Sequence, residues 1–292
     1  MRVALFITCL TDTFYPRTGI AVVKVLEHLG CQVDFPQAQT CCGQPMYNNG
    51  FHDDARDLAR RLVSVFEDAE YVVCPSGSCT AMIHDYYPEL LRDDPAYAHA
   101  VDPFVHKVYE FSRFLTEVLK VDLRQHDARW PGTVTYHYSC HLRGIGVKSP
   151  ILPLEGDVSA KSYAAADLDA RGETSGGMAP LDDPAVRLLH QIQDLQYVQL
   201  AKADQCCGFG GTFATKMPTI SGAMVRDKVD CIRATGAPVC VSSEGGCTMN
   251  IAGSAHRQGV DVHFKSLAEI IAESLGLMEP EDSSQRARRS QR

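Results

Sequence analysis

Apolar positions along the chain fall into two alternating patterns. Short continuous apolar runs such as residues 2–8 are typical of buried strands, whereas apolar residues three or four positions apart, as in residues 19–29, are typical of amphipathic helices. Gly30 follows the first helical stretch and is expected to end it. By the same criteria the sequence predicts further strands at 32–35, 71–73, 133–138, 197–200, 238–242 and 260–264, and helices at 53–69, 107–119, 184–192, 221–235 and 267–275.

The order of these elements repeats halfway along the chain. Alternating strands and helices predict an α/β fold with parallel sheets, because right-handed crossovers bring successive strands into parallel order. A chain of 292 residues is long enough for two such domains. We therefore predict two tandem Rossmann-like units at residues 1–130 and 131–278, with an insertion of low periodicity at about 155–183 and a disordered tail at 279–292.

The cysteines repeat with the two units. Each unit contains a cysteine doublet followed by glycine (CCG), with one cysteine well before the doublet and another well after it. The first cysteine set comprises Cys9, Cys41, Cys42 and Cys79, and the second cysteine set comprises Cys140, Cys206, Cys207 and Cys247. All of them follow predicted strands, so parallel order should gather each set at the sheet edge where open α/β folds bind ligands.

One position breaks the match between the two cysteine sets. Cys74 lies five residues before Cys79 and offers the first unit a possible fifth sulfur, whereas Ser242 occupies the matching position in the second unit. The remaining cysteines are better explained as small buried apolar residues than as ligands. They are Cys31, Cys231 and Cys240.

The net charge and the expected compartment restrict the kinds of partner and site that the chain can have. A net charge of −8 without a basic stripe gives no reason to expect nucleic acid binding. The sequence shows no secretory signal and no run of about 18 apolar residues that would span a bilayer. We therefore expect a cytoplasmic protein, in which twelve cysteines indicate metal binding or catalysis rather than disulfides. Adjacent cysteines are also poorly placed to form a disulfide with each other.

Thiolates gathered from distant segments favour an iron–sulfur centre, and the glycines after the doublets would let main-chain N–H groups approach the sulfurs. Zinc is the alternative metal, although the short-spaced ligand pairs of structural zinc sites are absent. His137 and His141, beside Cys140, keep a mixed zinc site open in the second unit, and each is equally compatible with a structural role. A redox disulfide between a doublet and a distant cysteine is a further alternative.

The sequence contains neither a dinucleotide-binding fingerprint nor a P-loop. A chain that carries electrons without a hydride-accepting cofactor is expected to be one subunit of a larger system.

Six segments carry a resemblance to a known family. They are FITCLTDTFYP (6–16), VDFPQAQTCCGQPMYNNG (33–50), SGSCT (76–80), YHYSCHLRGIG (136–146), ADQCCGFGGTFATKMP (203–218) and GCTMNI (246–251). At these residues the chain resembles the cysteine-rich CCG-domain family, which includes the cysteine-rich subunit of heterodisulfide reductase and iron–sulfur subunits of glycolate, glycerol-3-phosphate and lactate oxidation. The resemblance is greatest to the lactate utilization members and covers most of residues 1–275.

The resemblance implies a function and a ligand set. Both cysteine sets would bind iron–sulfur clusters, of the 4Fe-4S type with one per half, and Cys74 would be a further candidate ligand that makes a non-cubane cluster in the first half an open alternative. The chain would be the electron-transfer subunit of a system that oxidises L-lactate to pyruvate with two partner proteins, one of them of the ferredoxin type. A heterodisulfide-reductase-like subunit acting on thiols is the alternative redox function, and a zinc-stabilised interaction module is the non-redox alternative.

Overall fold

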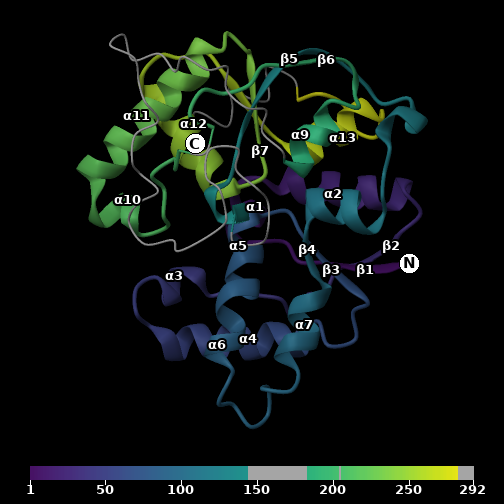
Figure 1. Cartoon of the computed structure of the whole chain (residues 1–292), viewed down its shortest axis with the longest axis vertical. Helices are drawn as coiled ribbons and strands as arrows, with labels where there is room; N and C mark the ends of the chain where they lie inside the picture. Colours follow the sequence, from purple (N-terminus) through teal and green to yellow (C-terminus); the bar gives the residue numbers. More distant parts are fainter. Residues whose placement is uncertain (144–182, 204, 282–292) are drawn as a thin grey trace, which may run out of the picture.

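The computed structural model describes residues 1–143, 183–203 and 205–281 (Figure 1). These residues form two parallel four-stranded sheets with the same strand order, β2-β1-β3-β4 and β6-β5-β7-β8. The first sheet comprises β1 (Arg2–Leu5), β2 (Gln32–Asp34), β3 (Tyr71–Cys74) and β4 (Val108–Glu110). The second comprises β5 (Arg129–His137), β6 (Gln193–Tyr197), β7 (Val239–Ser242) and β8 (His263–Ser266). The predicted fold class, α/β with two repeated units, is confirmed.

The helices of the first half connect and cover its strands. They are α1 (Cys9–Phe14), α2 (Pro16–His28), α3 (Gln44–Tyr47), α4 (His52–Val65), α5 (Gly77–Ala81), a π-helical turn at Met82–Tyr86, α6 (Tyr87–Leu90), α7 (Val101–Lys107), α8 (Phe111–Arg113), a second π-helical turn at Phe114–Val118 and a 3₁₀ turn at Leu123–His126. Their apolar faces bury the sheet, as the periodicity predicted for α2 and α4.

The second half repeats this pattern. Its helices are a 3₁₀ turn at Cys140–Arg143, α9 (Pro184–Leu189), α10 (Phe213–Lys216), α11 (Pro218–Ala234), α12 (Gly245–Arg257) and α13 (Leu267–Ser274). Within the described residues, no helix is long and apolar enough to cross a membrane.

The two halves share one hydrophobic core. Helix α2 of the first half packs against α13 of the second, and Val25 belongs to the same buried cluster as Ile270. The other face of the first sheet forms a separate cluster in which Phe6 packs with Leu62 and Phe104. Figure 1 shows the helices of this second cluster, α4, α6 and α7, at the lower end of the molecule, and α2 beside α9 and the second sheet above.

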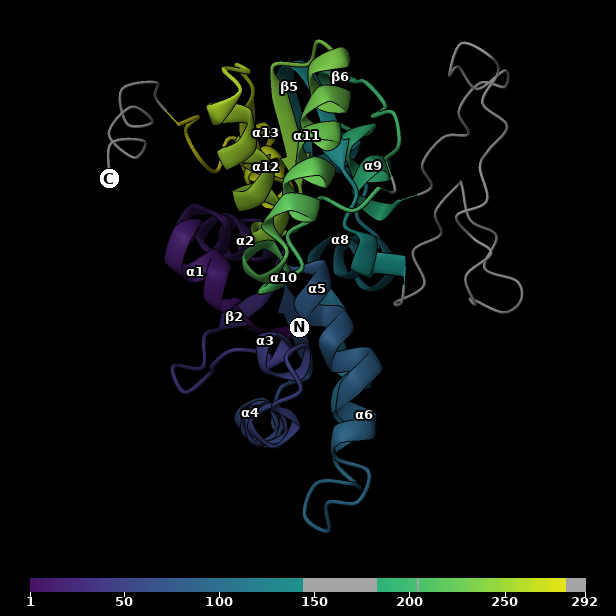
Figure 2. The ribbon, with the colours of Figure 1, turned by 90° about the vertical axis from the view of Figure 1, so that its left-hand side faces the viewer.

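A view from the side shows the same arrangement of helices and sheets along the molecule. Figure 2 shows α4 and α6 again at the lower end and α11 with the second sheet at the upper end, while α5 and α10 lie between them. Helix α5, which carries Cys79, therefore lies where the halves meet.

Several elements differ from the sequence prediction. The strand expected at 260–264 is β8, and the short helices α1, α3, α6, α7 and α10 were not predicted. The helix expected at 107–119 begins with a strand, β4, because Val108 and Glu110 are buried on the sheet edge before the chain turns into α8. The strand expected at 197–200 is β6, which ends at Tyr197, because this half-exposed edge strand carries polar residues that hide it from a search for apolar runs. The helices α5 and α12, which carry Cys79 and Cys247, were not predicted.

The predicted domain boundaries stay predictions. β5 begins at Arg129, close to the expected boundary. Apart from a few residues at their edges, the expected insertion and tail lie outside the described residues.

Candidate metal centre

Both cysteine sets line a single cavity of about 310 Å³ at the junction of the two halves. Each set comes from three segments, which follow the carboxyl ends of β1, β2 and β3 in the first half and of β5, β6 and β7 in the second. The cavity-lining cysteines are Cys9, Cys41, Cys42, Cys79, Cys140, Cys206, Cys207 and Cys247. Parallel strand order brings these residues together for the reason given by the sequence: all the loops emerge at the same edge of each sheet.

The cysteines of the first set differ in their exposure to solvent. Cys9, at the start of α1, is exposed, whereas Cys42 and Cys79 are buried. The Sγ atoms of Cys9 and Cys41 are 3.7 Å apart, and those of Cys42 and Cys79 are 3.3 Å apart. This half therefore presents two close thiol pairs to the cavity.

The second cysteine set has a similar arrangement. Cys207 and Cys247 are buried with their Sγ atoms 3.0 Å apart, and Cys140 and Cys206 are half-buried. The Sγ atom of Cys140 also lies 3.8 Å from Nδ1 of His141, which lines the same cavity. All twelve cysteines of the chain are free thiols.

The two thiols of each doublet differ in acidity. Hydrogen bonds from the thiols of Cys42 and Cys9 lower the pKa of Cys41 to about 3, and hydrogen bonds from neighbouring thiols lower the pKa of Cys206 to about 2. The second cysteine of each doublet donates to its neighbours and is deeply buried, so the pKa values of Cys42 and Cys207 are raised. Each doublet thus begins with a residue that favours the thiolate, which is the form that binds metals.

The glycine after each doublet supplies main-chain donors to the sulfurs, as the sequence predicted. The N–H of Gly208 donates to Sγ of Cys206 at 3.3 Å, and the N–H of Phe209 donates to Sγ of Cys207 at 3.5 Å. Gly43 and Gly208 have φ values of 86° and 78°, which favour glycine. A Cβ on Gly208 would also lie 2.9 Å from the carbonyl oxygen of Ser221.

Cys74 does not line the cavity. Its side chain is fully buried at the end of β3, where Sγ donates to the carbonyl oxygen of Ser76 at 3.6 Å. In the second half, Oγ of Ser242 donates to the carbonyl oxygen of Glu244 at 3.3 Å. The two residues therefore make the same hydrogen bond, across the same turn, in their respective halves. Burial raises the pKa of the Cys74 thiol well above its ordinary value.

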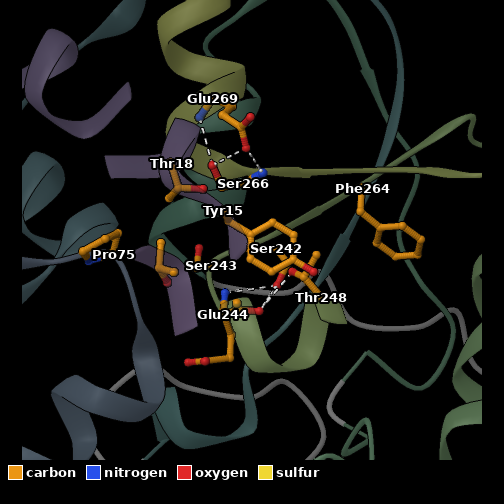
Figure 3. A pocket seen from close by; sticks show the side chains of 12 residues that line it. Tyr15, Thr18, Pro75, Ser242, Ser243, Glu244, Thr248, Phe264, Ser266 and Glu269 are labelled. Atoms are coloured by element: carbon orange, nitrogen blue, oxygen red, sulfur yellow. Dashed lines mark hydrogen bonds between the residues drawn. The ribbon is translucent and has the colours of Figure 1, made fainter. Parts of the chain in front are cut away.

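Glu244 links the two halves behind the cavity, and sequence reasoning did not identify it. Its Oε2 accepts hydrogen bonds from Oγ of Ser76 and the N–H of Ser78, each at 2.8 Å, and its Oε1 accepts from the N–H of Gly246 at 3.3 Å. One buried carboxylate thus caps both α5 and α12. Figure 3 shows this carboxylate turned away from a small polar cavity of about 30 Å³ lined by residues that include Ser242. The only available signal was its position, which matches that of Ser76.

His137 ends β5 beside the second cysteine set. One of its ring nitrogens lies within 4.8 Å of the Sγ atoms of Cys207 and Cys247, and all three side chains are buried. Within the part of the chain that the structure describes, neither ring nitrogen has a hydrogen-bond partner. Burial lowers the pKa of His137 to about 3, so the imidazole is neutral at physiological pH.

Comparison with known proteins identifies the family. A model of the CCG cysteine-rich domain matches residues 3–84 and 178–252. Lactate utilization protein A of Halalkalibacterium halodurans is 42% identical over 271 residues, which cover 93% of this chain and 96% of that protein. The chain belongs to the lactate utilization protein A family. The family members from Exiguobacterium sp. and Macrococcus caseolyticus are 40% and 41% identical and cover 94% and 93% of this chain, and 98% and 96% of their own lengths.

The family's cysteine-rich domain accounts for most of the cavity. The first matched segment contains the whole first cysteine set, and the second contains every member of the second set except Cys140. Among solved structures, a glutamate racemase from Francisella tularensis aligns with a TM-score of 0.32 and 11% identity over 96% of this chain and 84% of that one, a likeness too small to inform fold or function.

The residues that line the cavity fit a metal or iron–sulfur group. Eight free thiols converge on one space, two of them have pKa values lowered toward the thiolate, and main-chain N–H groups point at the sulfurs of the second doublet. Thiolate ligands and N–H donors to sulfur are the features that hold and tune iron–sulfur clusters.

Proposed function

We propose that this chain is the iron–sulfur electron-transfer subunit of a system that oxidises L-lactate to pyruvate. The observation that carries the proposal is the convergence of both cysteine sets on one cavity. The names of its relatives supply the substrate, lactate. Their names also indicate a system of several proteins, and we propose two partners, one of them a ferredoxin-type iron–sulfur protein.

The two cysteine sets would each hold one cluster, of the 4Fe-4S type. Such a cluster, when bound, accepts and releases single electrons. The chain itself supplies thiolates, main-chain N–H donors and a partly water-excluding site, since four of the eight cavity thiols are buried. Cys9 is exposed, so we propose that electrons enter or leave on the side of the first set. Free thiols persist in a reducing compartment, which supports a location in the cytoplasm.

Cys74 is proposed to act in the turn rather than as a fifth ligand. It lies outside the cavity and makes the hydrogen bond that Ser242 makes in the other half. The thiolate ligands of both centres would then be the matched cysteines alone.

The test is the composition of the protein purified without oxygen. We expect iron and acid-labile sulfide in similar amounts, with Cys42→Ser and Cys207→Ser each lowering both by about half, because each variant removes a ligand of one cluster. Cys231→Ser is the matched control, since Cys231 lies on α11 outside the cavity, and it should leave both unchanged. A protein that holds zinc without sulfide would overturn the proposal and favour the zinc-stabilised module.

The substrate is tested with the partners present. Lactate should reduce the clusters of the assembled system, and a thiol or disulfide should not. The reverse result would favour the heterodisulfide-reductase-like alternative.

A further inference from the structure

His137 occupies a position that the repeat makes comparable with a residue of the first half. It lies three residues before Cys140, as Phe6 lies three residues before Cys9. In the second sheet His137 on β5 pairs with Ser242 on β7. In the first sheet Leu5 pairs with Val73, so the next residues along the two strands, Phe6 and Cys74, lie opposite each other. His137 and Phe6 therefore stand at the same place on the central strand of their sheets.

The two halves fill this place with very different side chains. Phe6 is fully buried and packs edge-on against Phe66, with ring centroids 5.8 Å apart. His137 is only 1% exposed, and no described residue forms a hydrogen bond with either of its ring nitrogens. A buried polar group without a partner costs about 1–3 kcal/mol, so a purely structural role would be better served by an apolar ring like that of Phe6.

The side chains around the imidazole of His137 indicate that a metal could be the partner of its ring nitrogen. A ring nitrogen of His137 and the Sγ atoms of Cys207 and Cys247 all lie within 4.8 Å of one another, and among the described residues they form the one such group of three buried donors. The first half has no counterpart, because Phe6 carries no donor atom. Imidazole nitrogen and thiolate sulfur together suit iron–sulfur centres and zinc alike.

We propose that His137 is a ligand of the metal centre in the second half, binding together with the thiolates of Cys207 and Cys247. A 4Fe-4S cluster has four iron sites, so its fourth ligand would be one of the two half-buried cysteines, Cys140 or Cys206, and not both. The inference rests on the proposed function in that it takes the second cysteine set to hold such a centre. It makes the two centres chemically different: the first is bound by thiolates alone, and the second has a neutral nitrogen ligand.

The nitrogen ligand should give the second centre a higher reduction potential than the first. Imidazole ligation raises the reduction potential of an iron–sulfur centre relative to thiolate ligation. This effect favours the reduced state, so the second centre should be reduced before the first.

The experiment uses the full chain, purified without oxygen from cells supplied with ¹⁵N-labelled histidine and then partly reduced. Pulsed electron paramagnetic resonance should detect one strongly coupled ¹⁵N nucleus at the centre reduced first. His137→Phe, which copies the residue of the first half, should abolish that coupling. His141→Ala should retain it, because the Nδ1 contact of His141 is with Cys140 rather than with the buried pair.

The outcomes separate this inference from the proposed function. Two results would overturn the role of His137 and leave the proposed function intact. In the first, the unsubstituted protein contains iron and sulfide but shows no strong nitrogen coupling. In the second, the coupling is present and disappears only in His141→Ala. The unsubstituted protein alone gives the first of these results, so poor folding of His137→Phe does not prevent a decision.

If no iron or sulfide is found, the proposed function fails, and Co²⁺ loading decides on His137. Binding at least about tenfold weaker in His137→Phe than in the unsubstituted protein would support the ligand. Equal affinities would overturn it.

Discussion

Ser76 and Glu244 occupy the same position in the two repeats, and they are hydrogen-bonded to each other, with Oγ of Ser76 donating to Oε2 of Glu244 at 2.8 Å. Each precedes the helix that carries the last cysteine of its set, Cys79 in α5 and Cys247 in α12. The N–H of Gly77 donates to the carbonyl oxygen of Ser243 beside this bond, at 3.4 Å. The two site-bearing turns therefore contact each other directly, and a change in one should be transmitted to the other.

Glu244→Ala should destabilise the fold and loosen both metal centres. The change leaves the hydroxyl of Ser76 and the N–H groups of Ser78 and Gly246 without their acceptor, a loss of about 3 kcal/mol in the free energy of unfolding. Metal content should fall for both halves, because the carboxylate caps both helices. Urea unfolding and metal analysis measure the two effects.

Ser76→Ala is the partner variant in a double-mutant cycle. It should cost about 1 kcal/mol, and the coupling energy between the two changes should be at least about 0.5 kcal/mol. Additive effects, or metal lost from the second half alone, would show that the contact does not connect the sites.

Gly208→Ala should damage the second centre far more than Gly211→Ala does. Both glycines have positive φ, so both variants bear the strain of about 1–2 kcal/mol that a left-handed residue causes. Of the two, only Gly208 would carry a Cβ that clashes, at 2.9 Å from the carbonyl oxygen of Ser221, whereas no atom of the described residues lies within 4 Å of a Cβ at Gly211. We expect Gly208→Ala to lose about 2 kcal/mol more in thermal or urea unfolding and to reduce metal binding in the second half. Equal losses in the two variants would contradict this role of the CCG glycine.

Cys74→Ser should retain both centres, because serine makes the same turn in the second half. Cys79→Ser, a few residues away, removes a thiol that lines the cavity and should lower the iron content by about half. Iron and sulfide analysis of the two variants distinguishes the roles. A loss of iron in Cys74→Ser as large as in Cys79→Ser would make Cys74 a ligand.

Glu110→Gln should become stabilising as the pH rises. Burial raises the pKa of Glu110 to about 7 from an ordinary value of 4.5, although the carboxylate accepts hydrogen bonds from Ser112 and from the N–H of Arg113. The folded state therefore binds this proton more tightly than the unfolded state, so the contribution of Glu110 is most favourable below pH 4.5 and declines as the pH rises through about 7.

Unfolding of the two proteins at about pH 5 and about pH 8 measures the effect. The stability of Glu110→Gln relative to the unsubstituted protein should increase over that interval by up to about 3 kcal/mol. Glu117→Gln removes only a partly exposed pair with Arg113 and should change stability by less than about 1 kcal/mol at either pH. A constant difference between Glu110→Gln and the unsubstituted protein would show that Glu110 is not buried as described.

The sequence was sufficient to predict the repeat, the parallel α/β class and the association of the cysteines with strand ends. Apolar runs such as residues 2–8 and the turn residues after them report local structure directly, and parallel topology then fixes where the loops emerge. β4 was missed because its three residues merge into the helical pattern that follows, and β6 was misplaced because it is polar. Both are edge strands, where packing constrains the sequence least.

The contacts between the halves could not be predicted from the sequence. Glu244 gives no signal in the sequence beyond its position, and its bonds to Ser76 and Ser78 depend on how two complete sheets pack. The same is true of the single cavity: the spacing of the cysteines predicts two gathered sets, but it does not reveal that they face each other. His137 was noticed beside Cys140, yet only its burial and its unpartnered nitrogens distinguish it from His141.

Electron paramagnetic resonance of the fully reduced protein tests whether the two cysteine sets hold two iron–sulfur centres in one cavity. We predict a spectrum altered by magnetic interaction between two nearby centres, and a simple uncoupled signal from the remaining centre in both Cys42→Ser and Cys207→Ser. A spectrum of the unsubstituted protein that equals the sum of the two variant spectra, or the absence of any iron–sulfur signal, would contradict the two-centre cavity.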